Sequence, residues 1–218
     1  MTRGLCVLAA LSIITLALER NSLSATEYTS SLGRLGAADR KQVKRADDYF
    51  RNINTVKSDF YQFNSIDQGS SMGTFQVAKP NKFRFEYLNS PRSLFISNGG
   101  VTTYYDMELD EISVLPASKI PLVLLLSGQS GLEDLNSEIL GVNYVGDNCV
   151  ITTRILLDDI EYGVEYVFDR KIENLREIHI VIEEEQKITL RLINTEINSV
   201  LDKDVFIFRN PRLHRKRK

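Results

Sequence analysis

The serines that could serve as a catalytic nucleophile lie in the segment Ser127–Gly131, which reads Ser-Gly-Gln-Ser-Gly. The nucleophile elbow of a hydrolase has the pattern Gly-x-Ser-x-Gly, in which the serine is exposed on a sharp turn. A match centred on Ser130 requires glycine at position 132, where this chain has Leu132. The base of a triad would have to be His179 or His214. His179 lies in a stretch of alternating residues, where we expect it to face solvent, and His214 lies in the basic C-terminal tail. We therefore predict no serine hydrolase activity.

Two groups of carboxylates could in principle form the acid pair of a glycoside hydrolase. They are Asp106 with Asp110 and Glu111, and Asp158 with Asp159 and Glu161. Both groups lie at predicted strand ends, where solvated turn acids are common, and neither has the spacing of a calcium loop. Phosphate-loop and dinucleotide fingerprints are also missing from the sequence. The sequence thus predicts a protein that is not an enzyme.

Cysteine and histidine occur only twice each. This number excludes a disulfide framework and a zinc ribbon, so we expect no metal and no cofactor. Cys6 is not a lipoprotein acylation site, because residues 2–5 leave no room for an apolar core ahead of it. Cys149 is followed by Val150 and Ile151, and this context predicts a buried thiol inside a strand.

The composition is that of an ordinary globular protein. Of 218 residues, 43% are hydrophobic and 26% are charged, and the formal net charge is -2. Six of the last ten residues are basic, which leaves the rest of the chain acidic. Basic side chains form no patch interleaved with aromatic residues, so we expect no nucleic-acid partner.

The N-terminus predicts export. Gly4–Leu18 is a stretch of fifteen uncharged residues, which suits a signal peptide better than a membrane span of about 20 residues. We predict a signal peptide over residues 1–25, with an uncleaved anchor as the alternative, then a flexible linker over residues 26–38. A single domain over residues 39–211 and a basic tail over residues 212–218 complete the predicted organisation.

An amphipathic helix is predicted at the start of this domain, with Asp39 as its N-cap. Its apolar positions follow helical spacing: Val43, Ala46, Phe50, Ile53 and Val56.

From Lys57 onward the apolar period changes to two, as in Phe83-Phe85-Tyr87 and Val164-Tyr166-Phe168. Short turn signals separate these runs, and Asn98-Gly99 is the strongest hairpin signal among them. Ten or eleven short strands joined by such turns predict one large antiparallel sheet, which must curl.

The segment from Ile120 to Leu126 interrupts this pattern as an apolar run, and Pro121 fits the first turn of a short helix. A second short helix is predicted at Leu132–Leu135. The run either plugs one open end of a barrel or forms a movable lid over an apolar cavity.

An ordered set of segments follows the predicted helix along the chain: Phe60-Tyr61-Gln62, Gly73-Thr74-Phe75, Lys79 to Tyr87, Pro91, Ile96 to Asp106, Ile120-Pro121-Leu122 and Phe206 to Pro211. This order of segments resembles the LolA family, the periplasmic carriers of outer-membrane lipoproteins. The resemblance covers about residues 40–211.

The resemblance implies a mainly β fold, an unclosed antiparallel β-barrel of about eleven strands with an N-terminal helix and a short apolar helical lid. The apolar interior would hold lipoprotein acyl chains. By position, we expect Phe60, Phe83 and Phe85 to line this acyl cavity, and Leu122, Leu125 and Leu126 to form the lid.

Two positions depart from the family pattern. The family has an arginine before Pro-Asn, and this arginine ties the lid to the barrel. This chain has Lys79 at that position. Lysine lacks the planar fork of arginine, so we expect Lys79 to be a looser latch between lid and barrel. The alternative is that Lys79 is a solvated turn residue. The family tryptophan of the Asn-Gly hairpin is replaced by Thr103, which implies a locally altered lining.

The family further implies a periplasmic, monomeric chaperone that shuttles lipoproteins from the inner to the outer membrane. Its partners would be acylated lipoproteins, an inner-membrane ABC-type lipoprotein exporter and an outer-membrane lipoprotein acceptor. The alternative is a lipid-sensing regulator or a carrier of another lipid on the same fold.

Overall fold

The computed structural model describes residues 31–89, 91–116, 131–132, 137–157, 160–182 and 186–214. The predicted signal peptide, the lid residues Leu122, Leu125 and Leu126, and the last four residues of the basic tail lie outside this part of the chain.

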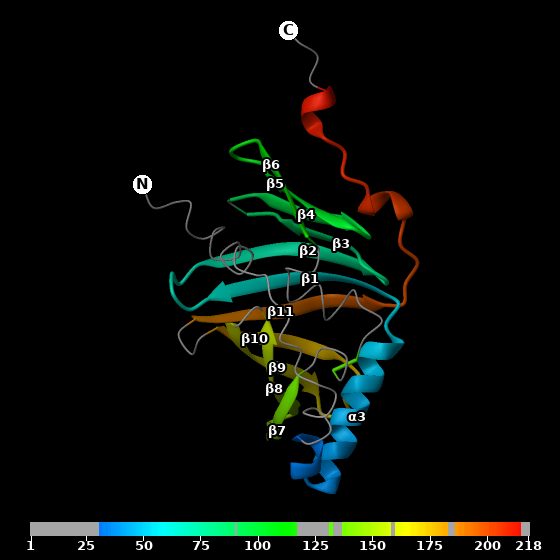
Figure 1. The fold of residues 1–218 in the computed structure, drawn as a ribbon, viewed down its shortest axis with the longest axis vertical. Coiled ribbons are helices and arrows are strands. Elements are labelled where there is room, and N and C mark those ends of the chain that lie inside the picture. Colours follow the sequence, from blue (N-terminus) through cyan, green and yellow to red (C-terminus); the bar gives the residue numbers. More distant parts are fainter. Residues whose placement is uncertain are drawn as a thin grey trace.

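Helix α3, eleven strands and two short 3-10 helices have both of their ends within the described residues (Figure 1). They are α3 (Ala37–Asn52), β1 (Thr55–Asn64), β2 (Ser70–Ala78), β3 (Lys82–Tyr87), β4 (Ser93–Asn98), β5 (Val101–Asp106), β6 (Glu111–Pro116), β7 (Glu138–Val145), β8 (Asn148–Leu157), β9 (Ile160–Asp169), β10 (Leu175–Ile182), β11 (Gln186–Ile197), η3 (Lys203–Phe206) and η4 (Pro211–His214).

The strands form a single antiparallel sheet, as predicted. Its order is β6-β5-β4-β3-β2-β1-β11-β10-β9-β8-β7, so the first and last strands in sequence pair at its centre. The strands β6 and β7 are the two edges and do not pair with each other within the described residues. The predicted unclosed barrel is therefore confirmed.

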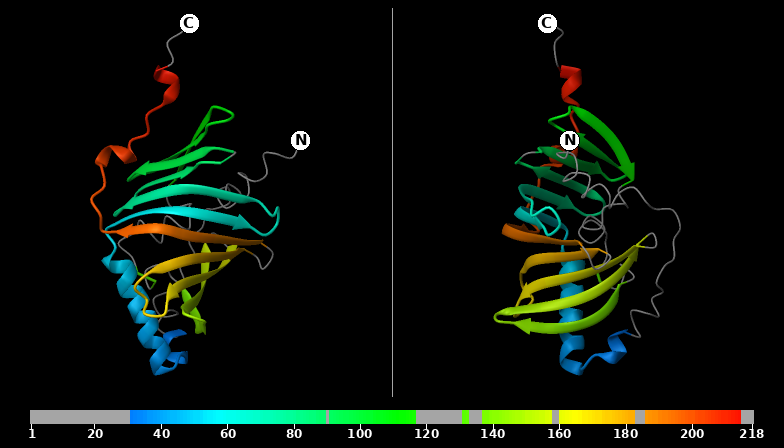
Figure 2. Two further views of the ribbon diagram at one scale, coloured as in Figure 1. Left: turned by 180° about the vertical axis from the view of Figure 1, so that it is seen from behind. Right: turned by 90° about the vertical axis from the view of Figure 1, so that its left-hand side faces the viewer.

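The sheet is strongly curved (Figure 2). Register shifts occur in three strand pairs: β1 with β11, β9 with β10 and β7 with β8. A bulge adds a residue to one strand, which bends that strand and increases its twist. These irregularities favour curling, and the concave face bears most of the buried apolar side chains.

Tight turns join most neighbouring strands. Asn98-Gly99 connects β4 to β5 as predicted, and Gly99 has a φ of 111°, which a residue with a side chain rarely adopts. The turns at Gly146 and Asn81 also have positive φ values.

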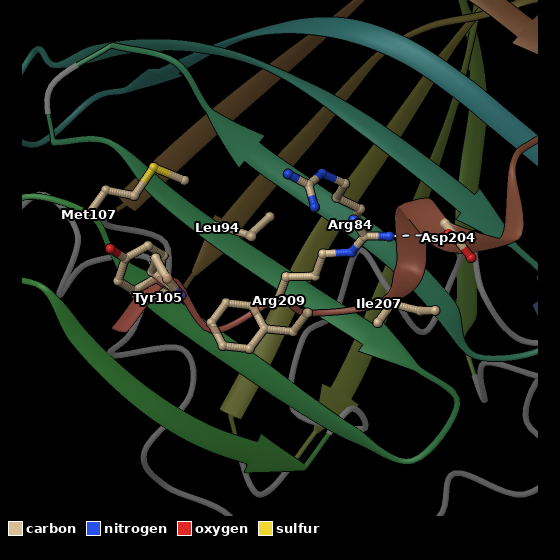
Figure 3. A pocket seen from close by; sticks show the side chains of 9 residues that line it. Arg84, Leu94, Tyr105, Met107, Asp204, Ile207 and Arg209 are labelled. Atoms are coloured by element: carbon tan, nitrogen blue, oxygen red, sulfur yellow. Dashed lines mark hydrogen bonds and ion pairs between the residues drawn. The ribbon is translucent and has the colours of Figure 1, made fainter. Parts of the chain in front are cut away.

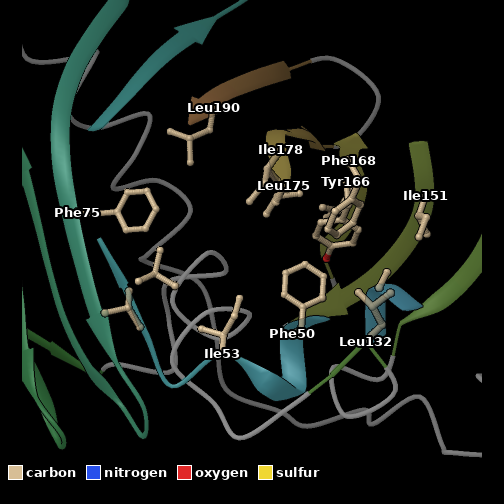
Figure 4. Packing of buried hydrophobic residues seen from close by; sticks show 14 of the residues in the cluster. Phe50, Ile53, Phe75, Leu132, Ile151, Tyr166, Phe168, Leu175, Ile178 and Leu190 are labelled. Carbon is tan, nitrogen blue, oxygen red and sulfur yellow. The ribbon is translucent and has the colours of Figure 1, made fainter. Parts of the chain in front are cut away.

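Helix α3 packs on the concave side of the β8–β10 half of the sheet (Figures 1 and 4). Its buried residues are Val43, Ala46 and Phe50, three of the predicted apolar positions. The ring of Phe50 meets Tyr166 and Phe168 of β9 edge-on, with centroid separations of 5.4 and 5.9 Å.

The predicted N-cap of this helix was wrong. The helix begins at Ala37 with Gly36 as N-cap, and no side chain caps it; Asp39 lies in the first turn instead. An acidic side chain in the first turn still interacts favourably with the helix dipole.

Residues 31–38 differ from the flexible linker expected there. Residues 31–34 are helical, and the buried Ser31 hydroxyl accepts a hydrogen bond from the Ile139 backbone N–H of β7 at 3.1 Å. Leu32 and Leu35 pack against the core. These apolar contacts explain why this short segment is ordered against the sheet.

Candidate functional site

A continuous row of aromatic rings lines the concave face of β1 to β5. Neighbouring ring centroids in this row are between 4.6 and 6.4 Å apart. We refer to these residues as the aromatic wall: Phe60, Phe75, Phe83, Phe85, Tyr87, Phe95 and Tyr104.

The wall follows from the period-two pattern of each strand. Phe83 and Phe85 alternate with partly exposed neighbours in β3 and are buried, with exposed fractions of 0% and 6%. Cross-strand pairing then places Phe85 beside Phe75 of β2 and Phe95 of β4. Because partners in an antiparallel sheet share a face, the rings of adjacent strands form one surface.

Gly73 makes room for one of these rings. It pairs with Phe60, and a Cβ atom at Gly73 would lie 2.6 Å from Cζ of Phe60 and 2.2 Å from the Glu86 carbonyl oxygen. Because glycine has no side chain, the Phe60 ring can lie across β2 and meet the Tyr87 ring edge-on, with a centroid separation of 5.2 Å.

Three of the residues predicted to contact acyl chains, Phe60, Phe83 and Phe85, therefore lie together in the wall. The predicted lid residues lie outside the described part of the chain. The prediction did not include Phe75, Phe95 or Tyr104. The burial of β2 and β5 alternates at Phe75 and Tyr104, whereas Phe95 lies in β4, where five consecutive residues are buried and no alternation marks it.

The tyrosine at position 104 lies in the wall, whereas Thr103, the position of the family tryptophan, does not. Thr103 pairs with Ile96 and shares the convex face with it, opposite to Tyr104. The expectation that Thr103 alters the lining is thus wrong, because strand alternation turns this side chain away from the wall.

Lys79 connects the sheet to the N-terminal helix. Its ammonium group donates a hydrogen bond to the Phe50 carbonyl oxygen, in the last turn of α3, at 2.6 Å. Burial, followed by the charge of Arg51, holds the pKa of Lys79 below its ordinary value of 10.5. Lysine is a suitable partner for the carbonyl groups at a helix C-terminus. The predicted contact of Lys79 with the lid concerns residues outside the described chain.

The polar residues considered for catalysis have structural roles. His179 lies on the convex face, where its side chain is 18% exposed, and its ring nitrogens each lie 2.9 Å from a carboxylate oxygen, one of Glu165 and one of Glu177. Asp106 is not a solvated turn acid but is buried, and it accepts hydrogen bonds from the backbone N–H groups of Glu108 and Leu109.

Cys149 is buried in β8 as predicted. Within the described residues, no group of three potential ligands could hold a metal ion.

A separate pocket lies on the convex side, between β3–β5 and the C-terminal segment (Figure 3). Its volume is about 310 Å³. The two arginines in its lining are paired with carboxylates: Arg84 with Glu86 at 2.7 Å and Arg209 with Asp204 at 3.1 Å. The wall, which consists of seven neighbouring aromatic rings and carries no charged side chain, is therefore the better candidate for binding an apolar ligand.

A comparison with protein families identifies the fold's relatives. Residues 51–209 match the family model described as "Outer membrane lipoprotein carrier protein LolA". The chain belongs to the LolA family.

Individual relatives of this LolA-family chain are distant. An outer-membrane lipoprotein carrier protein of Halorhodospira halophila is 30% identical over 109 residues, which cover 46% of this chain and 52% of the relative. A protein of the same name from Pseudoalteromonas translucida is 23% identical over 172 residues, 75% of this chain and 81% of the relative. The chain spans about half the length of the first two curated relatives that it matches.

Solved structures similar to the LolA-family chain include a crystal structure of MucB, with a TM-score of 0.47 and 13% identity over 79% of this chain and 63% of that one. A LolA superfamily protein from Nitrosomonas europaea has a TM-score of 0.46 and 6% identity over 79% and 99% of the two chains.

No helix among the described residues of the LolA-family chain is both long and apolar enough to cross a membrane.

Proposed function

We propose that this protein is a periplasmic carrier that binds the acyl chains of lipoproteins and shuttles them from the inner to the outer membrane. The observation that supports this role is the aromatic wall on the concave face of an unclosed, curled sheet. Membership of the LolA family favours a lipoprotein as the ligand.

The wall suits the energetics of such a ligand. Removing an acyl chain from a membrane costs about 0.8 kcal/mol per CH2, so about 14 methylenes correspond to roughly 11 kcal/mol. Apolar contacts between the acyl chains and the aromatic rings of the wall can compensate for this cost. An unclosed sheet can also release the chains again, because no hydrogen bonds join its two edge strands, β6 and β7, in the described part of the chain. This cycle requires no covalent chemistry.

The resemblance to the LolA family implies the proposed partners. An inner-membrane ABC-type exporter would load the carrier, and an outer-membrane lipoprotein acceptor would receive the cargo. The carrier itself would act as a monomer. The lid residues Leu122, Leu125 and Leu126 and the latch residue Lys79 belong to the same proposal, with the lid controlling access to the wall.

The proposal is tested by lipoprotein release from spheroplasts that accumulate a labelled outer-membrane lipoprotein. The purified protein is added, and the soluble fraction is examined by size-exclusion chromatography. We expect the label to leave the membrane as a soluble one-to-one complex. A matched pair of variants locates the binding surface: Phe85→Ser in the wall should abolish release, whereas Tyr61→Ser, on the exposed convex side of β1, should not.

Folding of both variants is checked by circular dichroism. If folded wild-type protein releases no lipoprotein, the proposed function is wrong. Mass spectrometry of a lipid extract from the natively purified protein would then show whether it carries another lipid.

A further inference from the structure

Two buried hydroxyl groups on the concave face of β5 have no hydrogen-bond partner among the described residues. They are Oγ1 of Thr102, which is fully buried, and the phenolic oxygen of Tyr104, whose residue is 6% exposed. The two residues are separated by one position and therefore point to the same side of the sheet. They account for two of the four such side-chain atoms in the described part of the chain.

Other buried hydroxyls of this sheet are satisfied. Thr153, which is fully buried, donates to the Val164 carbonyl oxygen at 3.3 Å, and the partly buried Tyr87 of the aromatic wall donates to the side-chain oxygen of Gln62 at 2.9 Å. A buried polar group without a partner costs free energy, so native proteins contain few of them. Two adjacent ones on the face that bears the aromatic wall suggest that their partner is a ligand.

The surroundings of these hydroxyls are polar. Cross-strand pairing places Ser97 opposite Thr102, and Ser93 opposite Asp106, on the concave face of β4 and β5. We refer to Ser93, Ser97, Thr102, Tyr104 and Asp106 as the polar strip; all five residues are buried. Ser93 and Asp106 lie near enough to influence the pKa of Tyr104, but its hydroxyl forms a well-aligned hydrogen bond with neither.

The polar strip is continuous with the aromatic wall. The Tyr104 ring packs on Phe95 of the wall with a centroid separation of 4.6 Å, which holds the hydroxyl in place. On the other side, Tyr104 pairs with Ser113 of the edge strand β6, and Ser113 is exposed. A ligand lying along the wall would therefore meet the strip near the open edge of the sheet.

The chemistry of the strip favours a neutral acceptor. Both unpartnered groups can donate an O–H, and burial raises the pKa of Tyr104 above its ordinary value, so this donor stays protonated. The Asp106 carboxylate on the same face would repel a phosphate or a free carboxylate. An ester or amide carbonyl provides the acceptor without the charge.

We propose that the polar strip binds the ester carbonyl groups through which acyl chains are attached to a lipoprotein, with the Thr102 and Tyr104 hydroxyls as donors. This inference rests on the proposed function, since it assigns the polar end of the same acyl ligand.

The experiment compares two probes in fluorescence titrations with the full protein. One is a fluorescent lipopeptide with ester-linked acyl chains, and the other is the same lipopeptide with ether-linked alkyl chains, which lacks the ester carbonyls. One hydrogen bond corresponds to about tenfold in affinity, so Tyr104→Phe should weaken ester-lipopeptide binding about tenfold and leave ether-lipopeptide binding unchanged. Thr102→Val should act in the same direction.

The matched control is Tyr105→Phe. Tyr105 is the next residue in β5, points to the convex face and donates to Asp110 at 3.0 Å, so its removal should affect neither probe. Equal weakening of both probes by Tyr104→Phe, or no weakening of either, would overturn the subsite while leaving the carrier role intact. Failure of the wild-type protein to bind either lipopeptide would overturn the carrier role and the subsite together.

Discussion

Lys79 shows how one side chain can link two elements of the fold. Its ammonium group reaches the carbonyl oxygen of Phe50 at the end of α3, while its backbone N–H donates to the Asn54 carbonyl oxygen at 2.8 Å. Phe50 is also the helix residue whose ring packs on β9. The position of α3 on the sheet thus depends on both the Phe50 ring and the Lys79 ammonium group.

Replacing Lys79 by methionine keeps the aliphatic stem and removes the donor. We expect the free energy of unfolding to fall by about 1–2 kcal/mol, because a hydrogen bond from a charged group is lost. Urea unfolding measures this change, and Lys57→Met, which removes a lysine whose side chain is 53% exposed, serves as the control.

If Lys79 also holds the lid, as the family resemblance implies, Lys79→Met should in addition slow lipoprotein handover. An unchanged unfolding midpoint would show that Lys79 is only a turn residue.

At the scale of elements, charged side chains connect β9, β10 and β11 on the convex face. His179 of β10 lies between Glu165 of β9 and Glu177 of its own strand, and Arg191 of β11 donates to Glu177 at 2.7 Å. Only an imidazolium carries N–H groups on both ring nitrogens, so only the charged form of His179 donates to both carboxylates. This network supports the strand order that curls the sheet around α3.

Glu177 makes the stability of these strands depend on pH. Burial acts to raise its pKa, but the hydrogen bonds from His179 and Arg191 and their charges outweigh this effect and hold the pKa below the ordinary value of 4.5. An acid with a lowered pKa in the folded state adds stability above its unfolded pKa, and this stability is lost as the pH falls through the folded value.

We therefore expect Glu177→Gln to lower the free energy of unfolding at pH 7 by about 1 kcal/mol. The difference from wild type should shrink as the pH falls below 4.5, because the wild-type carboxylate becomes protonated there. Urea unfolding at a series of pH values measures this, with Glu196→Gln, at a side chain that is 56% exposed, as the control. A difference that does not vary with pH would contradict this role of the charge.

At the scale of the whole molecule, the C-terminal segment covers part of the convex face. The 3-10 helix η3 contacts β3 and β4, and Phe208 meets the Tyr105 ring edge-on at 6.0 Å. As a result Leu94 and Ile96, which point away from the aromatic wall, are only 5% and 2% exposed. Strand β4 is thus buried on both faces, unlike the half-buried strands around it.

Phe206 is the buried residue of η3, with an exposed fraction of 3%. We expect Phe206→Ala to lower the free energy of unfolding by about 3 kcal/mol, because it leaves a cavity over the sheet. Binding of the dye ANS should increase as apolar surface on β4 becomes accessible. The neighbouring variant Ile207→Ala, at a residue that is 45% exposed, should change both measurements much less. Equal effects of the two variants would mean that η3 does not cover the sheet in solution.

Much of the fold could be predicted from the sequence because the relevant signals are local. The alternation of Phe83, Phe85 and Tyr87 depends only on strand geometry, and the Asn98-Gly99 turn only on the backbone freedom of its glycine. The helical spacing of Val43, Ala46 and Phe50 likewise predicted the buried stripe of α3. The same local patterns, together with the family resemblance, pointed to Phe60, Phe83 and Phe85 as candidate ligand contacts.

Only the tertiary structure decided which segments cover which face. The pairing of β1 with β11 joins residues far apart in the chain, and no local pattern predicts it. The burial of Asp106, the position of His179 between two glutamates and the bond from Lys79 to Phe50 also depend on remote segments. Only the tertiary structure shows that the hydroxyls of Thr102 and Tyr104 have no partner among the described residues. Strand alternation decides which face of the sheet a side chain occupies, and this can be predicted from the sequence. The hydrogen-bond partner of a buried polar group depends instead on the remote segments that the fold places beside it.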